Sequence, residues 1–144
     1  MLEPGNPLTI IMVDDDAEDA MLTKAAIEAS GQKVDFHHIG SGIDLFEKLK
    51  ARLEESAVCS ALILLDLNMP VMDGREVLHK LRGHERFSKV PVIVVSTSSA
   101  KSDIDSCYAA GANAFVTKPV SFDRMVEAME SIGRFWGDTA RIPE

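Results

Sequence analysis

Short apolar runs alternate with longer amphipathic stretches along most of the chain, and this alternation limits the folds that the sequence can form. Runs rich in Val, Ile and Leu lie at residues 10–13, 62–65, 92–95 and 114–116. A weaker strand pattern lies at 34–39, and residues 8–9 extend the first run. Runs of this length are typical of strands buried on both faces, as in a parallel sheet.

Between these runs, apolar residues recur with helical spacing over residues 17–30, 41–54, 72 to about 84, 102–110 and 121 to about 135. Asp16 precedes the first of these stretches and Ser41 begins the second, and both are candidate N-caps. Gly31 and Gly111 follow two of the stretches, where glycine commonly ends a helix. Five strands alternating with five helices predict a doubly wound α/β fold with a mostly parallel sheet and right-handed crossovers.

The length and charge of the chain exclude several classes of protein. Its 144 residues fit one domain, and we expect flexible ends at residues 1–7 and 137–144. The formal net charge of −8 argues against nucleic acid or an anionic membrane as a partner, because both need a basic patch. The first residues do not form a signal peptide, and no apolar run approaches the ~20 residues of a membrane span.

Cysteine and histidine do not indicate a metal site. Cys59 and Cys107 fit no metal spacing, so we expect free thiols and a cytoplasmic location. The four histidines also lack zinc-like spacing, and we expect structural roles for His37, His38, His79 and His84.

Polar residues follow four of the expected strands, at the point where each strand ends. They are Asp14, Asp15 and Asp16, then Asp66, then Ser96 and Thr97, then Thr117 and Lys118. Because the carboxyl ends of parallel strands share one edge of a sheet, these side chains are expected to meet in one crevice. A helix cap or a turn explains any single position, and Asp16 is expected to be a cap. The whole set indicates a functional site.

The expected crevice has the parts that phosphoryl transfer needs. Clustered carboxylates repel one another and favour a shared cation, and an all-oxygen set of ligands suits Mg²⁺. A lysine ammonium can hold a phosphoryl oxygen, and a carboxylate can attack phosphorus to give an aspartyl phosphate.

The motifs, taken in order, resemble those of the receiver domain of two-component response regulators, which has the chemotaxis-type fold. The acidic pair Asp14-Asp15, the segment from Asp66 to Gly74 with the letters DLNMPVMDG, the strand-ending Ser96, and the segment FVTKP from Phe115 each match a family motif. The resemblance covers about residues 8–135. It implies a flavodoxin-like fold, with a five-stranded parallel sheet in the order 2-1-3-4-5 and helices on both faces.

The resemblance also implies roles for the matched residues. Asp66 would be the phosphorylated nucleophile, and Lys118 would bind a phosphoryl oxygen. The peptide bond between Lys118 and Pro119 would be cis. Ser96 and Phe115 would be the switch, changing position together and altering the surface of the fourth helix, fifth strand and fifth helix. The Mg²⁺ ligands would be Asp14, Asp15, Asp66 and the backbone carbonyl of Asn68.

A protein of this kind is a stand-alone response regulator and not a metabolic enzyme. We expect one receiver domain over residues 1–144, with a core of about residues 8–136 and no output domain. The resemblance implies a sensor histidine kinase or phosphotransfer protein as phosphodonor and a downstream protein as target. The segments 13–19 (VDDDAED) and 22–25 (LTKA) are also similar to those of regulators paired with phytochrome-type kinases, which implies a homodimer through the fifth helix and C-terminal extension. Phe135 and Trp136 fit either a partner anchor or a core-closing position.

Two other classes stay open on the sequence alone. A haloacid-dehalogenase-type phosphohydrolase would use Asp14 as its nucleophile, although Glu18 stands where that family has Thr or Val. A pseudo-receiver would dock partners without accepting phosphate, but such a protein would be expected to lack the acidic pair, Asp66 or Lys118. Identifying the aspartate that carries the phosphoryl group separates the three classes.

Overall fold

The computed structural model describes residues 7–55 and 60–143, and these residues form one parallel sheet in the order β2-β1-β3-β4-β5. Its strands are β1 (Leu8–Val13), β2 (Val34–Ile39), β3 (Leu62–Asp66), β4 (Val92–Ser96) and β5 (Ala114–Thr117). The helices are α1 (Ala17–Ser30), α2 (Gly42–Glu55), α3 (Gly74–Gly83), α4 (Lys101–Ala109), α5 (Phe122–Arg134) and the π-helix η1 (Phe135–Thr139). The predicted fold class and strand order are confirmed.

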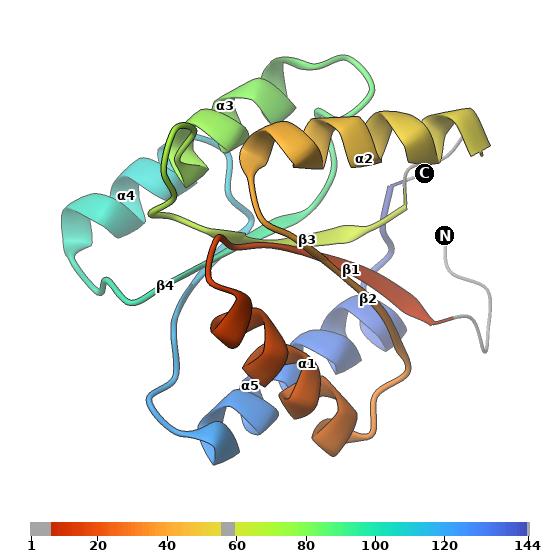
Figure 1. Ribbon diagram of the computed structural model, residues 1–144, viewed down its shortest axis with the longest axis vertical. Helices are drawn as coiled ribbons and strands as arrows, with labels where there is room; N and C mark the ends of the chain where they lie inside the picture. Colours follow the sequence, from red (N-terminus) through yellow and green to blue (C-terminus); the bar gives the residue numbers. More distant parts are fainter. Residues whose placement is uncertain (1–6, 56–59, 144) are drawn as a thin grey trace.

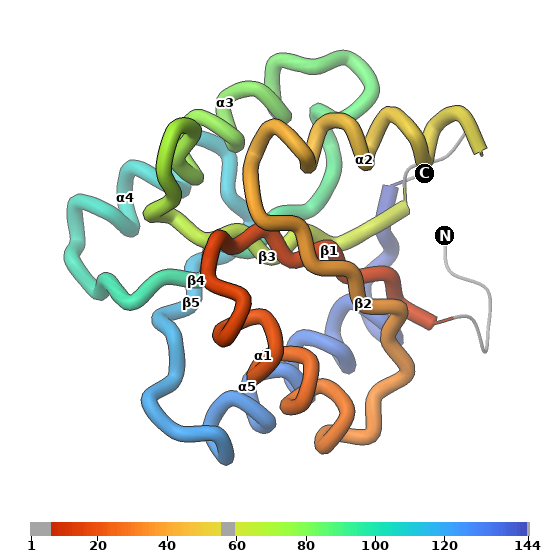
Figure 2. The backbone as a smooth tube through the Cα atoms, viewed as in Figure 1, coloured from red at the N-terminus to blue at the C-terminus, as the bar shows by residue number. Residues whose placement is uncertain are grey.

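Helices cover both faces of the sheet (Figure 1). α1 and α5 lie side by side on one face, and α2, α3 and α4 cover the other (Figure 2). The buried strand β3 shows the two-residue period that this arrangement requires. Its Ile63 and Leu65 pack into the layer under α2 and α3, whereas Leu62 and Leu64 pack into the layer under α1 and α5.

The local signals that begin and end the helices act mostly as predicted. The Asp16 carboxylate caps α1 by accepting from Glu18 N–H at 2.9 Å, and Gly31 ends that helix with a left-handed φ of 76°. Gly111 follows α4 with a φ of 108°. The predicted start of α3 at Met72 is wrong, because the Asp73 carboxylate accepts from Glu76 N–H at 3.0 Å and the helix begins at Gly74.

Part of the C-terminal segment packs onto the core, and the flexibility expected of the chain from residue 137 onward stays a prediction. Trp136 is half-buried against the layer formed by α1 and α5, and Ile142 is buried in the same layer. Phe135 stays half exposed and meets the Trp136 ring edge-on, with centroids 5.2 Å apart. Trp136 therefore closes the core, and Phe135 remains a candidate for contact with a partner.

Within the part of the chain that the structure describes, no helix is long and apolar enough to cross a bilayer. Cys107 is a free, buried thiol as expected, and Cys59 lies outside the described residues.

Candidate functional site

Three carboxylates meet at the carboxyl edge of the sheet. Asp14 and Asp15 follow β1, Asp66 ends β3, and the two strands are neighbours with Val13 opposite Leu65. One oxygen from each carboxylate lies within 4.8 Å of the others. Asp14 is only 1% exposed and Asp66 9%, whereas Asp15 is exposed. The predicted convergence of these residues is therefore confirmed.

This cluster fits a hard divalent cation. Its donors are all carboxylate oxygens, and Mg²⁺ commonly binds one or two carboxylates while keeping waters and a phosphate oxygen as its other ligands. Two hydrogen bonds fix the loop that carries the acidic pair: Asp14 Oδ1 accepts from Asp16 N–H at 2.9 Å, and His38 Nε2 donates to Asp14 O at 2.7 Å. His38 thus has the structural role expected of it, directly beside the site.

Lys118 neutralises part of the cluster from the end of β5. Its Nζ lies 2.8 Å from Asp19 Oδ2, 3.1 Å from Asp14 Oδ2 and 3.6 Å from Asp66 Oδ1. Asp19 is a site residue that the sequence reasoning missed, because an acid in the first turn of a helix is usually explained by the helix dipole. The Lys118–Pro119 bond is trans, so the predicted cis bond is wrong. The two isomers of such a bond differ by only ~0.5–1 kcal/mol.

The environment changes the acidity of two of these groups. Burial and, to a smaller extent, the charge of Asp14 raise the pKa of the Asp66 carboxyl from 3.8 to about 6, against the opposing charge of Lys118. For Lys118, burial alone would lower the pKa, but the hydrogen bond to Asp19 and the charges of Asp66 and Asp14 outweigh it and raise the pKa. Near neutral pH, Lys118 is therefore charged and Asp66 is mostly ionised.

The loop from β3 to α3 is tightly folded behind Asp66. A Cβ atom added to Gly74 would lie 2.6 Å from Asp66 O and 2.9 Å from Leu67 Cα, so only glycine fits there. Val71 has a φ of 67°, and Met72 N–H donates to Pro70 O at 2.8 Å across it, which makes a strained γ-turn. Strain of this kind is concentrated at functional sites. Asn68, the predicted carbonyl ligand, is exposed in the same loop.

The predicted switch residues lie on the strands beside the cluster. Ser96 ends β4 and is fully buried, with its Oγ accepting from Ser98 N–H at 3.2 Å. Lys118 N–H donates to Ser96 O at 2.7 Å, which joins the ends of β4 and β5. Phe115 is half-buried in β5 and packs against the layer under α2 and α3.

A polar network that the sequence reasoning missed connects the loop after β4 to two helices. Ser98 Oγ donates to Asp103 Oδ2 at 2.6 Å, and Arg75 donates to Asp103 Oδ1 at 2.6 Å and to Ser106 Oγ at 3.0 Å. Arg75 lies in the first turn of α3, which follows the loop from Asp66, whereas Asp103 and Ser106 lie in α4. No local sequence pattern predicts pairs so far apart in the chain.

The match of the sequence to a family model identifies the family of the chain. The family model described as the response regulator receiver domain matches residues 10–130. The chain belongs to the response regulator receiver family. It is therefore a signalling protein rather than a metabolic enzyme, and the phosphohydrolase alternative is not supported.

Similar receivers match almost the whole chain. This chain is 30% identical over 143 residues to the probable methanogenesis regulatory protein FilR2 of Methanothrix harundinacea, and the match covers 99% of this chain and 92% of FilR2. It is 29% identical over 142 residues to the response regulator Rcp1 of Synechocystis sp., covering 98% of this chain and 97% of Rcp1.

Two solved structures are similar along nearly their full length. The crystal structure of the phosphorylated cyanobacterial phytochrome response regulator RcpA has a TM-score of 0.83 at 30% identity, covering 96% of this chain and 100% of RcpA. The Mn²⁺-bound form of Rcp1 has a TM-score of 0.80 at 28% identity, covering 96% of this chain and 100% of that chain. The receiver fold is thus shared with relatives described as phosphorylated and as metal-bound.

Proposed function

We propose that Asp66 accepts a phosphoryl group from the phosphohistidine of a sensor histidine kinase or a phosphotransfer protein. The observation that carries this proposal is the placement of Asp66 within 4.8 Å of Asp14 and Asp15 and 3.6 Å from Lys118 Nζ. A carboxylate so placed is near both the candidate cation site and a fixed ammonium, which are the two charges that a transferred phosphoryl group needs nearby.

The residues of the chain have separate parts in this reaction. An ionised oxygen of Asp66 forms a bond to phosphorus while the bond from phosphorus to the donor imidazole nitrogen breaks, and that nitrogen takes up a proton. With a pKa of about 6, Asp66 is available as the carboxylate at neutral pH. Lys118 holds a phosphoryl oxygen. Asp14, Asp15, Asp66 and the Asn68 carbonyl would hold Mg²⁺, which neutralises charge on the phosphoryl oxygens when bound.

We infer that Ser96 and Phe115 convert phosphorylation into a change of shape. The phosphoryl group adds roughly −1.5 to −2 charges and three strong acceptors next to Asp66. The Ser96 Oγ accepts from Ser98 N–H, so its own proton is free to donate to one of these oxygens. When the hydroxyl turns toward the phosphoryl group, the bond to Ser98 N–H couples this movement to the loop after β4. This movement favours one of two arrangements of α4, β5 and α5, and a downstream protein reads the difference.

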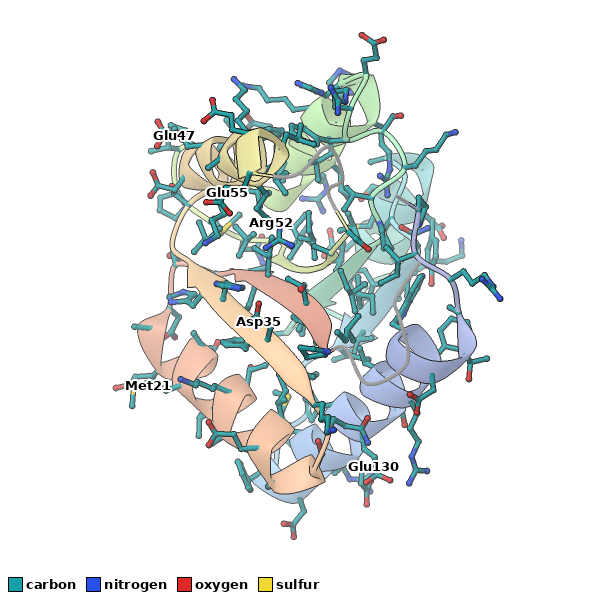
Figure 3. All side chains as sticks on the ribbon, turned by 90° about the vertical axis from the view of Figure 1, so that its right-hand side faces the viewer. Met21, Asp35, Glu47, Arg52, Glu55 and Glu130 are labelled. Carbon is teal, nitrogen blue, oxygen red and sulfur yellow. The ribbon has the colours of Figure 1, made fainter. Side chains whose placement is uncertain are left out.

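An apolar surface beside Lys118 suits the kinase side of this exchange. A cleft of about 330 Å³ between α1 and the loop after β5 is lined by Leu22, Lys118 and Val120, among others. Val120 is 99% exposed, and Met21 of α1 is 71% exposed and projects outward (Figure 3). Exposed apolar side chains next to a reactive site are typical of a docking surface for a partner protein.

Finer features of the partners stay proposals. The likeness to RcpA, a phytochrome response regulator, supports a phytochrome-type kinase as phosphodonor. The half-exposed Phe135 after α5 supports a homodimer through α5 and the C-terminal extension. We also propose a cytoplasmic location, because the phosphohistidine of the kinase is formed there from ATP.

The experiment identifies the aspartate that carries the phosphoryl group. Wild type, Asp66→Asn, Asp14→Asn and the exposed control Asp44→Asn are incubated with Mg²⁺ and acetyl phosphate, followed by intact mass measurement in acid. Borohydride reduction then marks the modified aspartate for peptide sequencing. We expect one phosphoryl group on Asp66 in wild type and the control, none in Asp66→Asn, and slow labelling in Asp14→Asn. A label on Asp14 would indicate the phosphohydrolase chemistry, and no label in wild type would indicate a pseudo-receiver.

A further inference from the structure

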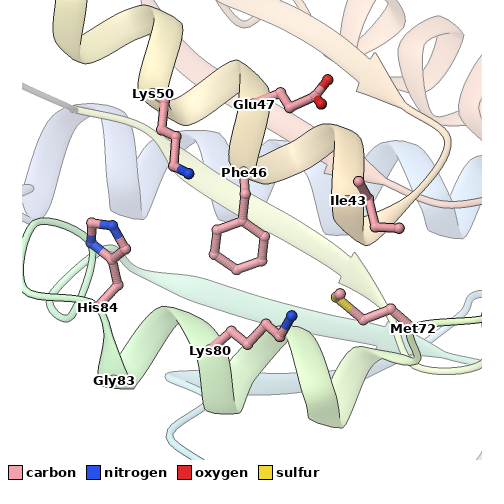
Figure 4. A pocket seen from close by; sticks show the side chains of 8 residues that line it. All are labelled: Ile43, Phe46, Glu47, Lys50, Met72, Lys80, Gly83 and His84. Atoms are coloured by element: carbon pink, nitrogen blue, oxygen red, sulfur yellow. The ribbon is translucent and has the colours of Figure 1, made fainter.

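A second concave surface lies between α2 and α3, apart from the carboxylate cluster. This groove, which we call the α2–α3 groove, has a volume of about 480 Å³ and is open to solvent along its side (Figure 4). It is lined by Ile43, Phe46, Glu47, Lys50, Met72, Lys80, Gly83 and His84. The volume is within the range of functional ligand and peptide sites.

The groove combines an apolar floor with a basic rim. Phe46 and Met72 form the floor, and Ile43 at one end is 51% exposed although it is a large apolar residue. Lys50 and Lys80 extend over the floor from opposite helices (Figure 4). In the described part of the chain, neither lysine forms a salt bridge, and Glu47 is the one acidic residue of the lining.

The third polar group of the rim is held in place. The His84 ring stacks on Phe87 with centroids 4.2 Å apart, and its Nδ1 accepts from Arg86 N–H at 3.1 Å. With Nδ1 as an acceptor, Nε2 carries a proton and can donate to a ligand. The groove therefore offers two ammonium groups and an N–H donor around an apolar floor.

The charge of this region is opposite to that of the chain as a whole. The groove is lined by Lys50 and Lys80 against Glu47, a net charge of +1, whereas the chain has a formal net charge of −8. A basic groove attracts an acidic segment of a partner and disfavours a symmetric contact with the same groove of a second copy. Charge complementarity therefore indicates what occupies the groove.

We propose that the α2–α3 groove binds an acidic peptide segment of a partner protein, with an apolar side chain of that segment resting on Phe46 and Met72. The lining positions 43, 46, 47 and 50 lie on one face of α2 over two helical turns, which span ~10 Å. That length suits several residues of a polypeptide. Phosphodiester chains are disfavoured by the apolar floor and by Glu47, so nucleic acid is the less suitable occupant.

This surface is independent of the phosphorylation proposed for Asp66. None of the carboxylates of the cluster lines the groove, and among the described residues no Lys or His of the groove forms an ion pair with the cluster. Gly83 provides part of the open space, because a Cβ added there would meet nothing within 4 Å. Substitution at these positions can therefore test the groove without disturbing phosphoryl transfer.

The test uses an unbiased probe, a displayed library of random twelve-residue peptides selected on the full-length immobilised protein. Selected peptides are synthesised, and their binding is measured by fluorescence anisotropy and mapped by amide chemical shifts. The groove variant is Lys50→Glu with Lys80→Glu. The matched control is Lys24→Glu with Lys33→Glu, which makes the same change in net charge at exposed lysines outside the groove.

We expect the selected peptides to share acidic residues around an apolar one and to shift the amides of Ile43, Lys50 and Lys80. The groove variant should weaken binding by about tenfold or more, whereas the control pair should weaken it by less than about threefold. The proposal would be overturned if the selected peptides lacked acidic residues, if both variants lost affinity equally, or if the amide shifts lay outside the groove. A selection that yields no binder would also overturn it. Preferred binding of a labelled single-stranded oligonucleotide in the same groove would also overturn it. Acetyl phosphate labelling of both variants checks that Asp66 is unaffected.

Discussion

Lys118 Nζ donates its shortest side-chain hydrogen bond, at 2.8 Å, to Asp19 of α1. The distance from Nζ to Asp66 Oδ1 is 3.6 Å, so the ammonium is shared unequally among the carboxylates around it. Because Asp19 draws Lys118 away from Asp66, it weakens the one nearby positive charge that favours the ionised form of Asp66. Asp19 is therefore part of the electrostatic balance of the site, although none of the matched receiver motifs gives it a role.

Replacing Asp19 by Asn should lower the pKa of Asp66 below its value of about 6. The substitution removes a competing acceptor and a nearby negative charge, so Lys118 interacts more strongly with Asp66 and stabilises its charged form. The pKa is measured by following the carboxyl ¹³C shift of Asp66 with pH in the presence of a chelator. Glu18→Gln, an exposed acid in the same helical turn, is the control and should leave the pKa unchanged. A pKa that stays the same or rises in Asp19→Asn would contradict this role.

The raised pKa of Asp66 predicts that the metal-free protein loses stability as the pH rises. Between pH 3.8 and about 6, the folded protein holds a proton on Asp66 that the unfolded chain has released. This extra proton stabilises the folded protein at the acidic end of the window, and the stabilisation is lost as the pH rises to about 6. Asp66→Asn removes the penalty of a buried charge at neutral pH. We expect the variant to be more stable than wild type by up to about 3 kcal/mol above pH 6, with the difference vanishing below about pH 4.

Urea unfolding of both proteins at the two ends of this window, with a chelator present, measures the effect. The difference between variant and wild type cancels the contributions of titrating groups that do not interact with Asp66. Asp44→Asn, which removes an exposed carboxylate at the start of α2, should show no such pH-dependent gain. A gain that is equal at acidic and neutral pH would mean that the charge of Asp66 is not its cause.

The features that the sequence predicts well depend on local patterns, and the features that it misses depend on contacts across the chain. The position of Asp66 at the end of a strand follows from the apolar run before it, and the ends of α1 follow from Asp16 and Gly31. The pair of Lys118 with Asp19 spans 99 residues and that of Arg75 with Asp103 spans 28. No periodicity fixes such pairs, because they depend on how helices are oriented after the sheet has formed. The packing of Ile142 is of the same kind, since a short polar segment with one apolar residue has no helical or strand period.

Gly74 should not tolerate a side chain, and a second glycine of the same helix provides the comparison. A Cβ at Gly74 would lie 2.6 Å from Asp66 O, whereas a Cβ at Gly83 would have nothing within 4 Å. Gly74→Ala should therefore cost more than about 2 kcal/mol of unfolding free energy and slow the phosphorylation of Asp66, because backbone atoms must move. Gly83→Ala should be neutral or stabilising by up to about 1 kcal/mol. Chemical unfolding and acetyl phosphate labelling measure the two effects, and equal costs for both variants would exclude the steric explanation.

The ion pair of Arg75 with Asp103 should hold the loop after β4 through Ser98. Arg75 donates to Asp103 at 2.6 Å, and the other oxygen of Asp103 accepts from Ser98 Oγ at 2.6 Å. Both charged side chains are about one-third exposed, so solvent screens the pair only in part. A double-mutant cycle with Arg75→Ala and Asp103→Ala should give a coupling of about 1 kcal/mol, and Arg75→Ala should speed hydrogen exchange at the Ser98 amide.

Lys101 and Asp105 provide a matched control on the same helix, α4. Their distance is also 2.6 Å, but the side chains are 88% and 61% exposed and belong to one helical turn. The same cycle on this pair should give less than about 0.5 kcal/mol and leave exchange at Ser98 unchanged, because an exposed pair within a helix is screened and links no separate elements. If the two pairs gave equal couplings, or if Ser98 exchanged as in wild type without Arg75, the loop would be held by the bond of Ser98 N–H to Ser96 Oγ instead.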